Sequence, residues 1–534
     1  MSVLTPYRSE VSSQGDGFAQ LLRAEWTKFR SVRGWVIGTV VGGLLIVALG
    51  VLTSASSVCS MGRVSGHNPN PAPPACPAPA TGPGGGWVSD SYYFVRKPLT
   101  GDGTLTVRVT SLTGLYSNRG ELGPSPNPLA GMRPGVQPWS KAGIIIRAST
   151  TRGSKYAAMM VTGSHGVRMQ WNFTRDSAGI AGQVSAQSPR WLRLTRSGDV
   201  IRGYDSADGR RWTLVGTATL AGLRTTVQAG LFATSPGYTA TTTSVGTASA
   251  VGGPTLATAA FDRLSLQGSW PAGPWTGQDI QARTDNALPA SVQGFSKHAG
   301  QFKVSGSGDI APANSDEAGQ AARTLGGAFA GLIAALVIGV MFITAEYRRG
   351  MIRTTFTASP RRGRVLAAKA VVLAGITFVG SLIAVAITIP LGDHLLRVNG
   401  NPIFPLPALT LLRIAVGTAA LLAIAAVLAL AVGTLVRRSA AAVTAVIAGI
   451  VLPYLLAITP GILPAGVEQW LVRVTPAAAF AVQQSIEHYP QVTQDYTPGN
   501  GYFPLAPWAG FAVLCAWAAA AFVLALFLLR RRDV

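Results

Sequence analysis

Residues 325–345 read LGGAFAGLIAALVIGVMFITA, and Glu346-Tyr347-Arg348-Arg349 follows directly. An α-helix needs about 20 apolar residues to cross the hydrocarbon core of a bilayer, and this uncharged run is long enough. A helix of that length on the surface of a soluble protein would carry a polar stripe, which this run lacks. The stretch therefore predicts a transmembrane helix that ends at a basic segment.

Five further apolar runs have similar lengths, so the sequence predicts an α-helical polytopic membrane protein with six transmembrane helices. A single crossing cannot use residues 414–458 at about 1.5 Å of helix per residue, so we expect a tight turn at Arg437-Arg438. The predicted bounds of the six helices are 35–57, 324–345, 370–391, 408–436, 440–458 and 508–529.

The composition agrees with a chain that lies only partly in lipid. Charged residues make up 12% of the 534 residues, whereas soluble domains carry about 25%. The 62 glycines and 34 prolines are too many for a helical bundle alone and indicate a second part rich in loops or strands. The net charge of +22 could indicate a nucleic-acid partner or the basic loops of a membrane protein, and its placement decides between them.

The basic residues concentrate in alternate loops between the predicted helices. They lie in residues 1–34, in the loop 346–369, at the arginine pair 437–438 and after the last helix, while the opposite loops carry few. Because cytoplasmic loops are enriched in Lys and Arg, we expect both termini in the cytoplasm and residues 58–323 outside a plasma membrane. The positive net charge is therefore explained by the cytoplasmic loops of a protein in the lipid bilayer, and a nucleic-acid partner is not needed to explain it.

The segment between the first two helices has a different pattern. Residues 58–89 form a linker rich in Pro, Ala and Gly, and short alternating runs with turn residues between them follow over 90–268. About eight or nine strands and no helical stretch predict an all-β sandwich outside the membrane. Residues 269–323 are expected to be a connector to the second transmembrane helix.

The β segment resembles the concanavalin A-like or laminin G-like jelly rolls. The resemblance depends on the order and spacing of residues 142–147, 191–194, 204–212 and 228–233. Such domains include sugar binders, so the resemblance allows a glycan or peptide ligand on a face with Trp139, Trp171 or Trp212; packing of these tryptophans in the core is the alternative. A glycosidase needs a close carboxylate pair, and no such pair lies on one predicted strand.

Two of the three cysteines lie in the inserted segment. Cys59 and Cys76 are both on the expected oxidising side, and a disulfide between them would reduce the freedom of the unfolded chain by about 3 kcal/mol. Two free thiols are the alternative.

Residues 18–33 form a candidate amphipathic helix ahead of the first transmembrane helix. On a helix, Leu22, Trp26 and Phe29 can share a face while Lys28 and Arg30 stay polar. This arrangement is typical of a helix that lies in the membrane interface.

The membrane part resembles the permeases of actinobacterial type-2 ABC transporters. The matching stretches are Arg23-Ala24-Glu25-Trp26-Thr27-Lys28-Phe29-Arg30-Ser31 before the first helix, and 346–355 and 360–369 between the second and third. The resemblance covers about 1–57 and 305–534, and the inserted β domain departs from it. It implies that the loop 346–369 contains the element that docks on the ATPase, with the residues Glu346, Arg348, Arg349, Arg353, Arg361, Arg362 and Arg364. It also implies short outer helices within 459–507.

The chain shows no ATPase motif of its own. A Walker A loop requires a Gly-Lys pair, and the sequence contains none. ATP and Mg²⁺ would therefore bind to a separate ABC ATPase subunit, and the resemblance implies a second permease copy in a homodimer or heterodimer. The expected function is the permease subunit of an ATP-driven exporter, not an enzyme. The alternative is a membrane-anchored protein of the cell surface that binds glycans or acts as a sensor.

Glu346 is the only acid in a loop with seven basic residues. Acids contribute little to membrane orientation, so a topological role does not explain it. We expect it to pair with Arg349 or Arg353, or to cap the amides of the next helix; a solvated acid at a helix end is the alternative.

Overall fold

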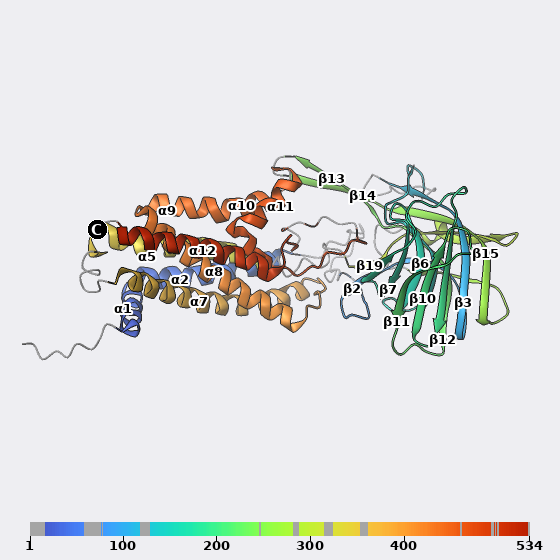
Figure 1. The fold of residues 1–534 in the computed structure, drawn as a ribbon, viewed down its shortest axis with the longest axis horizontal. Helices are drawn as coiled ribbons and strands as arrows, with labels where there is room; N and C mark the ends of the chain where they lie inside the picture. Colours follow the sequence, from blue (N-terminus) through green and yellow to red (C-terminus); the bar gives the residue numbers. More distant parts are fainter. Residues whose placement is uncertain are drawn as a thin grey trace, which may run out of the picture.

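The computed structural model of the chain describes residues 17–57, 76, 78–117, 129–244, 247–280, 288–313, 324–352, 361–459, 462–492, 496, 498 and 501–531. It has two parts (Figure 1): long helices that lie side by side, and a large β domain at one end of them. Helix α1 (Phe18–Ser31) and the end of α12 (Pro507–Arg531) lie at the other end, which we call the distal end.

Six helices in the described part of the chain are long and apolar enough to cross a membrane, as predicted. Helix α8 is the central one, since 67% of its apolar window is buried and it packs against α5, α7 and α12, whereas α2 is only 17% buried. The six are α2 (Arg33–Ser56), α5 (Gly327–Arg348), α7 (Arg362–Val398), α8 (Ala408–Val436), the segment Ser439–Ile458 and α12.

The helix bounds differ most from the predicted ones in α7. Its apolar run ends near residue 391, but the helix continues through Asp393 and Arg397, which lie one turn apart. The length of an apolar run marks what can lie in lipid, not where the helix ends. The predicted turn after α8 is present, with Arg437 in the left-handed region at φ 61°.

Two of the helical segments are irregular. The fifth apolar helix is divided into α9 (Ser439–Val446), the π-helical turn η2 (Ile447–Val451) and α10 (Leu452–Ile458). Between it and α12, the chain forms α11 (Ala465–Val474) and the 3₁₀ helix η3 (Pro476–Gln483), which is buried against α8 and α12. Short helices therefore do occur within 459–507.

The β domain is built on one long, curved sheet. Its main path runs β11-β10-β9-β3-β12-β5-β6-β7-β8, and all of its neighbouring strands are antiparallel. The strands on this path are β3 (Tyr92–Tyr116), β5 (Lys141–Arg147), β6 (Tyr156–Thr162), β7 (Val167–Trp171), β8 (Arg175–Ala178), β9 (Arg190–Ser197), β10 (Val200–Ser206), β11 (Thr213–Thr219) and β12 (Thr226–Thr234).

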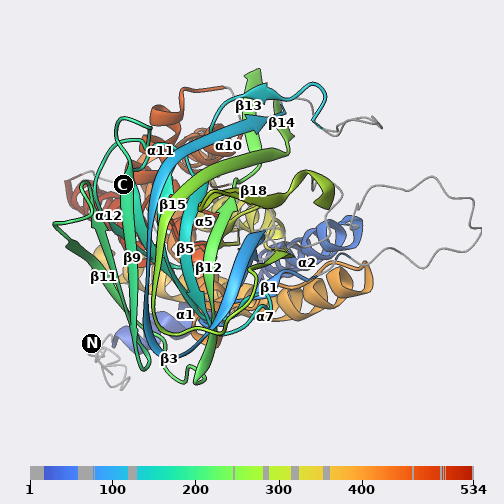
Figure 2. The same cartoon turned by 90° about the vertical axis from the view of Figure 1, so that its right-hand side faces the viewer.

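Strand β3 connects the two halves of this sheet. Its residues 93–100 pair with β12, and its residues 103–109 pair with β9. Gly101 lies between these two stretches with φ 71°, a conformation that favours glycine. Beyond the bend, β3 also pairs along most of its length with β15 (Thr255–Ser269), and Figure 2 shows both strands curving around the domain.

The curved sheet encloses an apolar core with contributions from nearly every strand. Leu105, Ile144, Leu192 and Leu231 are fully buried in it. A second cluster, which includes Phe94 and Phe232, fills the other face of β5 and β12. The predicted β-rich domain is thus present, but most of its strands are hydrogen-bonded into one 14-stranded sheet beside a small three-stranded sheet and a hairpin, and a sandwich of two separate sheets is not confirmed.

The β domain extends beyond the predicted bounds at both ends. At the start, the predicted linker contains β1 (Ala80–Thr81) and most of β2 (Trp87–Asp90). At the end, the predicted connector contains β16 (Thr276–Ile280), β17 (Gly294–His298), β18 (Gln301–Gly306) and β19 (Ile310–Pro312). Within the predicted bounds, β4 (Arg133–Pro134) pairs with β3, and a hairpin is formed by β13 (Tyr238–Ser244) and β14 (Thr247–Gly253). These strands are short and interrupted by Gly and Ser, so their alternation is too weak to predict.

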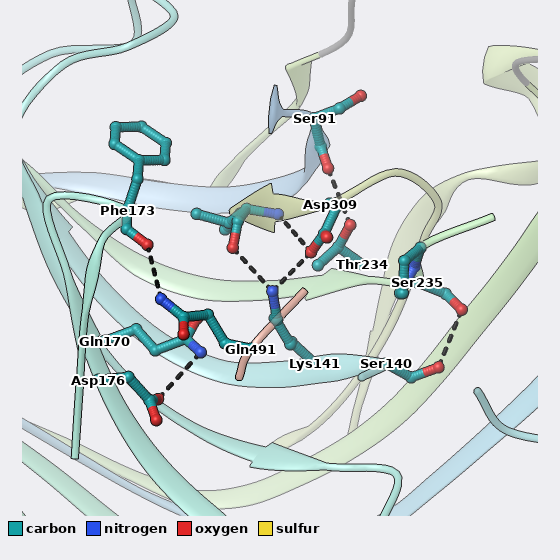
Figure 3. A network of polar contacts seen from close by, with 12 residues as sticks. Ser91, Ser140, Lys141, Gln170, Phe173, Asp176, Thr234, Ser235, Asp309 and Gln491 are labelled. Carbon is teal, nitrogen blue, oxygen red and sulfur yellow. Dashed lines mark hydrogen bonds and ion pairs between the residues drawn. The ribbon is translucent and has the colours of Figure 1, made fainter. Parts of the chain in front are cut away.

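Buried charges connect strand β5 to strands β2 and β19. The ammonium group of Lys141 donates to Asp309 Oδ1 at 2.6 Å and to the carbonyl of Ile310 at 2.7 Å (Figure 3), and this ties β5 to the chain that leads into β19. Arg147 at the other end of β5 pairs with Asp90 of β2 at 3.0 Å. Strands β2 and β19, which pair with each other, are thereby held against β5.

Candidate functional site

Four charged side chains meet at the distal end of the membrane helices. Glu25 and Lys28 come from α1, Glu346 from the last turn of α5, and Lys369 from the third turn of α7. We call these residues the four-charge cluster. Glu25, Glu346 and Lys369 are only 2%, 7% and 1% exposed, so the group lies inside the protein.

Lys369 is at the centre of this cluster. Its Nζ lies 2.7 Å from Glu25 Oε2 and 2.6 Å from Glu346 Oε1. The Nζ of Lys28 lies 3.0 Å from Glu25 Oε1 and 3.5 Å from Glu346 Oε1. Burial lowers the pKa of Lys28, but the two carboxylates outweigh burial and raise it above the ordinary value. Two acids and two bases therefore compensate each other where a single buried charge would be expensive.

Aromatic side chains enclose the cluster on the membrane side. Lys369 Nζ lies 4.8 Å from the centre of the Phe342 ring, and this ring packs edge to face on Phe29 of α1 at 5.7 Å and Trp35 of α2 at 5.9 Å. A cation over a ring face is favourable. The contacts lock α1 to the ends of α5 and α7 by charge and by packing together.

Exposed arginines surround the cluster on the other side. Arg348 and Arg349 end α5 and are exposed, as are Arg361 and Arg364 at the start of α7. Arg362 instead donates from Nη1 to the carbonyl of Leu529 in α12 at 2.8 Å. Among the described residues at this end, the only carboxylates are those of the cluster, so the surface around it is strongly basic.

The predicted interfacial helix is present as α1, but its faces differ in part from the predicted ones. Phe29 is buried and Leu22 packs beside it, whereas Trp26 is 50% exposed. Lys28 is half-buried in the cluster and Arg30 is exposed. The buried face is therefore centred on Glu25 and Phe29, because an acid with two ammonium partners can be buried next to an aromatic ring.

Glu346 has different partners from the predicted ones. We expected Arg349 or Arg353; the structure gives Lys369 and Lys28, and Arg353 lies outside the described residues. Packing of α1 against the two helix ends brings in partners from far along the chain, which loop sequence alone does not reveal. The other oxygen of Glu346, Oε2, is buried and has no hydrogen-bond partner in the described part of the chain.

The three tryptophans of the predicted ligand face each have their own partner. Trp139 is 5% exposed and stacks on His165 at 3.9 Å. Trp171 packs on the domain core, and the guanidinium of Arg193 lies 3.7 Å from the centre of the Trp212 ring. A ligand face formed by these residues stays a prediction.

The cysteines are only partly described. Cys76 is disulfide-bonded and Cys515 is free. Cys59 lies outside the described residues, so the pairing of Cys59 with Cys76 stays a prediction. Within the described ranges, no three His, Cys, Asp or Glu side chains are grouped to hold a metal ion.

Sequence reasoning missed Glu25 and Lys369 as members of a site. A usable indication existed: Glu25 is the only acid in residues 18–33 and Glu346 the only acid in residues 346–369, and Lys369 directly precedes an apolar run. Opposite charges at the same ends of neighbouring helices are expected to pair, because neither is stable unpaired near lipid.

Comparison with known proteins gives one family. A family model described as "ABC-2 family transporter protein" matches residues 216–534, more than half of the chain. No curated protein matches the chain.

Solved structures overlap with parts of the chain only. A functionally unknown protein from Saccharomyces cerevisiae is 20% identical, with 34% of this chain and 77% of that chain covered and a TM-score of 0.21. Scytalido-glutamic peptidase with a peptide-based transition-state analog is 10% identical, with coverages of 41% and 98% and a TM-score of 0.23. A mutant of the GH43 protein BlXynB from Bacillus licheniformis is 17% identical, with coverages of 25% and 24% and a TM-score of 0.16. These scores assign neither a fold nor an activity.

Proposed function

The chain belongs to the ABC-2 family of transporter proteins, and we propose that it is the permease subunit of an ATP-driven exporter whose ATPase is a separate subunit. ATP and Mg²⁺ would bind to that subunit. The basic distal end would face the cytoplasm, in agreement with the enrichment of Lys and Arg in cytoplasmic loops. A second permease copy, identical or not, would complete the transport path.

The four-charge cluster is the observation that carries this proposal. It joins α1 to the ends of α5 and α7 next to the exposed Arg348, Arg349, Arg361 and Arg364. A partner that docks on this basic surface pushes on all three helices at once. An acidic face on the ATPase subunit would complement the arginines, and charge complementarity sets orientation and association rate.

Coupling then follows from how the helices are connected. Force on the α5–α7 connection reaches α8, because both α5 and α7 pack on this central helix. Lysines suit a joint that moves, since an ammonium group is a compact charge on a flexible stem that can exchange carboxylate partners. Oε2 of Glu346, which has no hydrogen-bond partner among the described residues, offers one more acceptor to a donor from the docked subunit or from a rearranged helix end.

The experiment compares ATP hydrolysis by the purified permease–ATPase complex in lipid for Glu346→Gln, Arg349→Ala and wild type. Glu346→Gln keeps the shape and removes the charge from the joint; we expect coupled turnover to fall about tenfold while the complex still co-purifies. Arg349→Ala should weaken docking. Arg211→Ala is the matched control, because this side chain is 97% exposed on the β domain. Unchanged turnover in both test variants, with intact assembly, would contradict the proposed coupling role of this end.

The proposed orientation has its own test. Single cysteines at Asp208 and at Arg361 are compared for labelling by a membrane-impermeant maleimide in intact cells. Labelling at position 208 and protection at position 361 is expected. The reverse pattern would place the β domain in the cytoplasm and rule out the proposed arrangement.

A further inference from the structure

A cavity of about 650 Å³ lies between the β domain and the membrane helices. Its wall combines the β1–β2 turn at residues 82–86, the turn at residues 172–174, the start of α8 and the segment 484–489. Pockets of about 300–1,000 Å³ hold drug-sized ligands. The two parts of the chain therefore form a half-open pocket of ligand size where they meet.

Four residues of this wall also carry buried polar atoms without a partner in the described part of the chain. Arg413 Nε, Gln484 Oε1, Ser485 Oγ and Asn172 Oδ1 are all buried and have no hydrogen-bond partner in the part of the chain that the structure describes. Buried polar atoms in proteins are nearly always hydrogen-bonded. Four exceptions among the residues of one wall show that this region is incompletely hydrogen-bonded among the described residues.

Arg413 is held in position on this wall. One of its guanidinium Nη atoms donates to the carbonyl of Gln484. Its Nε is buried and has no hydrogen-bond partner among the described residues, while the side chain as a whole is partly exposed. Among the lining residues, Arg413 carries the only positive charge and Glu487 the only negative one. Glu487 is exposed and accepts a hydrogen bond from the Tyr489 hydroxyl at 2.9 Å.

The turn that brings Asn172 to the cavity is strained and externally fixed. Asn172 and Phe173 have φ of 48° and 69°, a region that non-glycine residues seldom adopt. Phe173 is fully buried, and its carbonyl oxygen lies 3.4 Å from Nε2 of Gln491, which comes from the membrane part (Figure 3). Strain of this kind persists where surrounding contacts hold it, and here it presents Asn172 to the cavity.

The rest of the wall is apolar. Trp87 packs edge to face on Phe404 at 5.3 Å, and both line the cavity together with Ile486. The exposed Glu487 carboxylate accepts from N–H donors, while the partly exposed Arg413 guanidinium pairs with an anion. A fatty acid offers no such donors. A short peptide supplies an ammonium group, a carboxylate, amide N–H groups and apolar side chains.

We propose that this cavity binds a short apolar peptide with free ends, its carboxylate at Arg413 and its ammonium group at Glu487. The site would make the β domain and the membrane helices respond to one ligand together. The inference does not depend on export or on the ATPase, because it concerns binding by this chain alone.

The test uses isothermal titration of the full chain in phosphatidylcholine nanodiscs, which expose both faces. The probes are trileucine with free ends, the same peptide with an amidated carboxyl end, the same peptide with an acetylated amino end, and decanoate. We expect trileucine to bind and each blocked peptide to bind about tenfold more weakly or worse. Arg413→Gln should remove the preference for the free carboxylate, and Glu487→Gln the preference for the free amine.

Matched controls come from α11, where Arg473→Gln and Glu468→Gln change the same residue types outside the lining of this cavity. Both should leave trileucine binding unchanged. Absence of trileucine binding at millimolar concentration, equal binding of free and blocked peptides, or tighter binding of decanoate would each overturn the proposal. Because Glu487 is exposed, its variant keeps the test decisive if Arg413→Gln fails to assemble.

Discussion

Each of the two parts of the molecule contains a buried ion-pair group that stabilises it, and the two groups are built in different ways. In the β domain, Arg147 is 1% exposed and its guanidinium donates to Asp90, to the Tyr92 hydroxyl, to Ser154 Oγ and to the Thr151 carbonyl. At the distal end, Lys369 touches the carboxylates of two other helices through a single nitrogen.

The difference separates a fixed joint from one that can change. A planar guanidinium with several oriented partners has one good geometry, whereas an ammonium group between two carboxylates can slide from one to the other. The partners of Arg147 belong to a single domain, while those of Lys369 are on separate helices. The molecule thus has a rigid domain at one end and an adjustable helix joint at the other.

The largest effect is expected at the rigid joint. Arg147→Ala leaves the buried Asp90 without its countercharge, which should destabilise the β domain by about 3–5 kcal/mol. The midpoint of protease resistance of the full chain in a urea series measures this. Arg211→Ala, at a fully accessible position in the same domain, should stay within about 0.5 kcal/mol of wild type. Equal midpoints for both variants would mean that Arg147 does not hold the domain together.

A smaller, local effect is expected at the adjustable joint. Lys369→Met leaves Glu25 and Glu346 facing each other with Lys28 as their only described countercharge, so α1 should open more easily by about 2 kcal/mol without a change in the β domain. Hydrogen exchange of the amides in residues 18–31 reports this opening. Arg364→Met, near the start of the same helix and exposed, is the control. If the amides of α1 exchanged as slowly in the Lys369→Met variant as in wild type, apolar packing alone would hold α1 against α5 and α7.

The smallest effect is expected for the outer lysine of the same cluster. The side chain of Lys28 is 42% exposed, so Lys28→Met should cost only about 0.5 kcal/mol in the same exchange experiment. Because salt screens exposed pairs, the difference from wild type should fade in molar salt. A loss as large as that of Lys369→Met, and insensitive to salt, would reverse the assignment of the central charge.

The membrane helices could be predicted from sequence because each is marked by a continuous apolar run of its own residues. Residues 325–345 contain no charge, and the length of that run is itself the information. The end of α7 could not be predicted in this way, because Asp393 and Arg397 stop the apolar run but continue the helix as neighbours one turn apart. Strands such as β5 were predictable for the same local reason, since Ile144-Ile145-Ile146 is buried on both faces.

The candidate site was only half predictable. The basic loop and Glu346 stood out by composition, but the partners of Glu346 lie 23 residues away in one direction and 318 in the other. Only the packing of α1 across two helix ends brings these residues together. The short strands β16, β18 and β19 escaped prediction for a related reason, because they pair with the distant strands β3, β15 and β2, respectively.

The pairing of β2 with β19 also determines how early the β domain can be completed during synthesis of the chain. Asp90 lies opposite Ile310 in this pair, and the amide of Ala313 donates to the carbonyl of Trp87 at 2.9 Å. About 220 residues separate the two strands, and a ribosome that adds about 5–20 residues per second needs roughly 10–45 s to deliver the second after the first. During that interval β2 can pair with β1 while its other edge stays open, and α2 waits without α5, since α5 is made only after the β domain is complete.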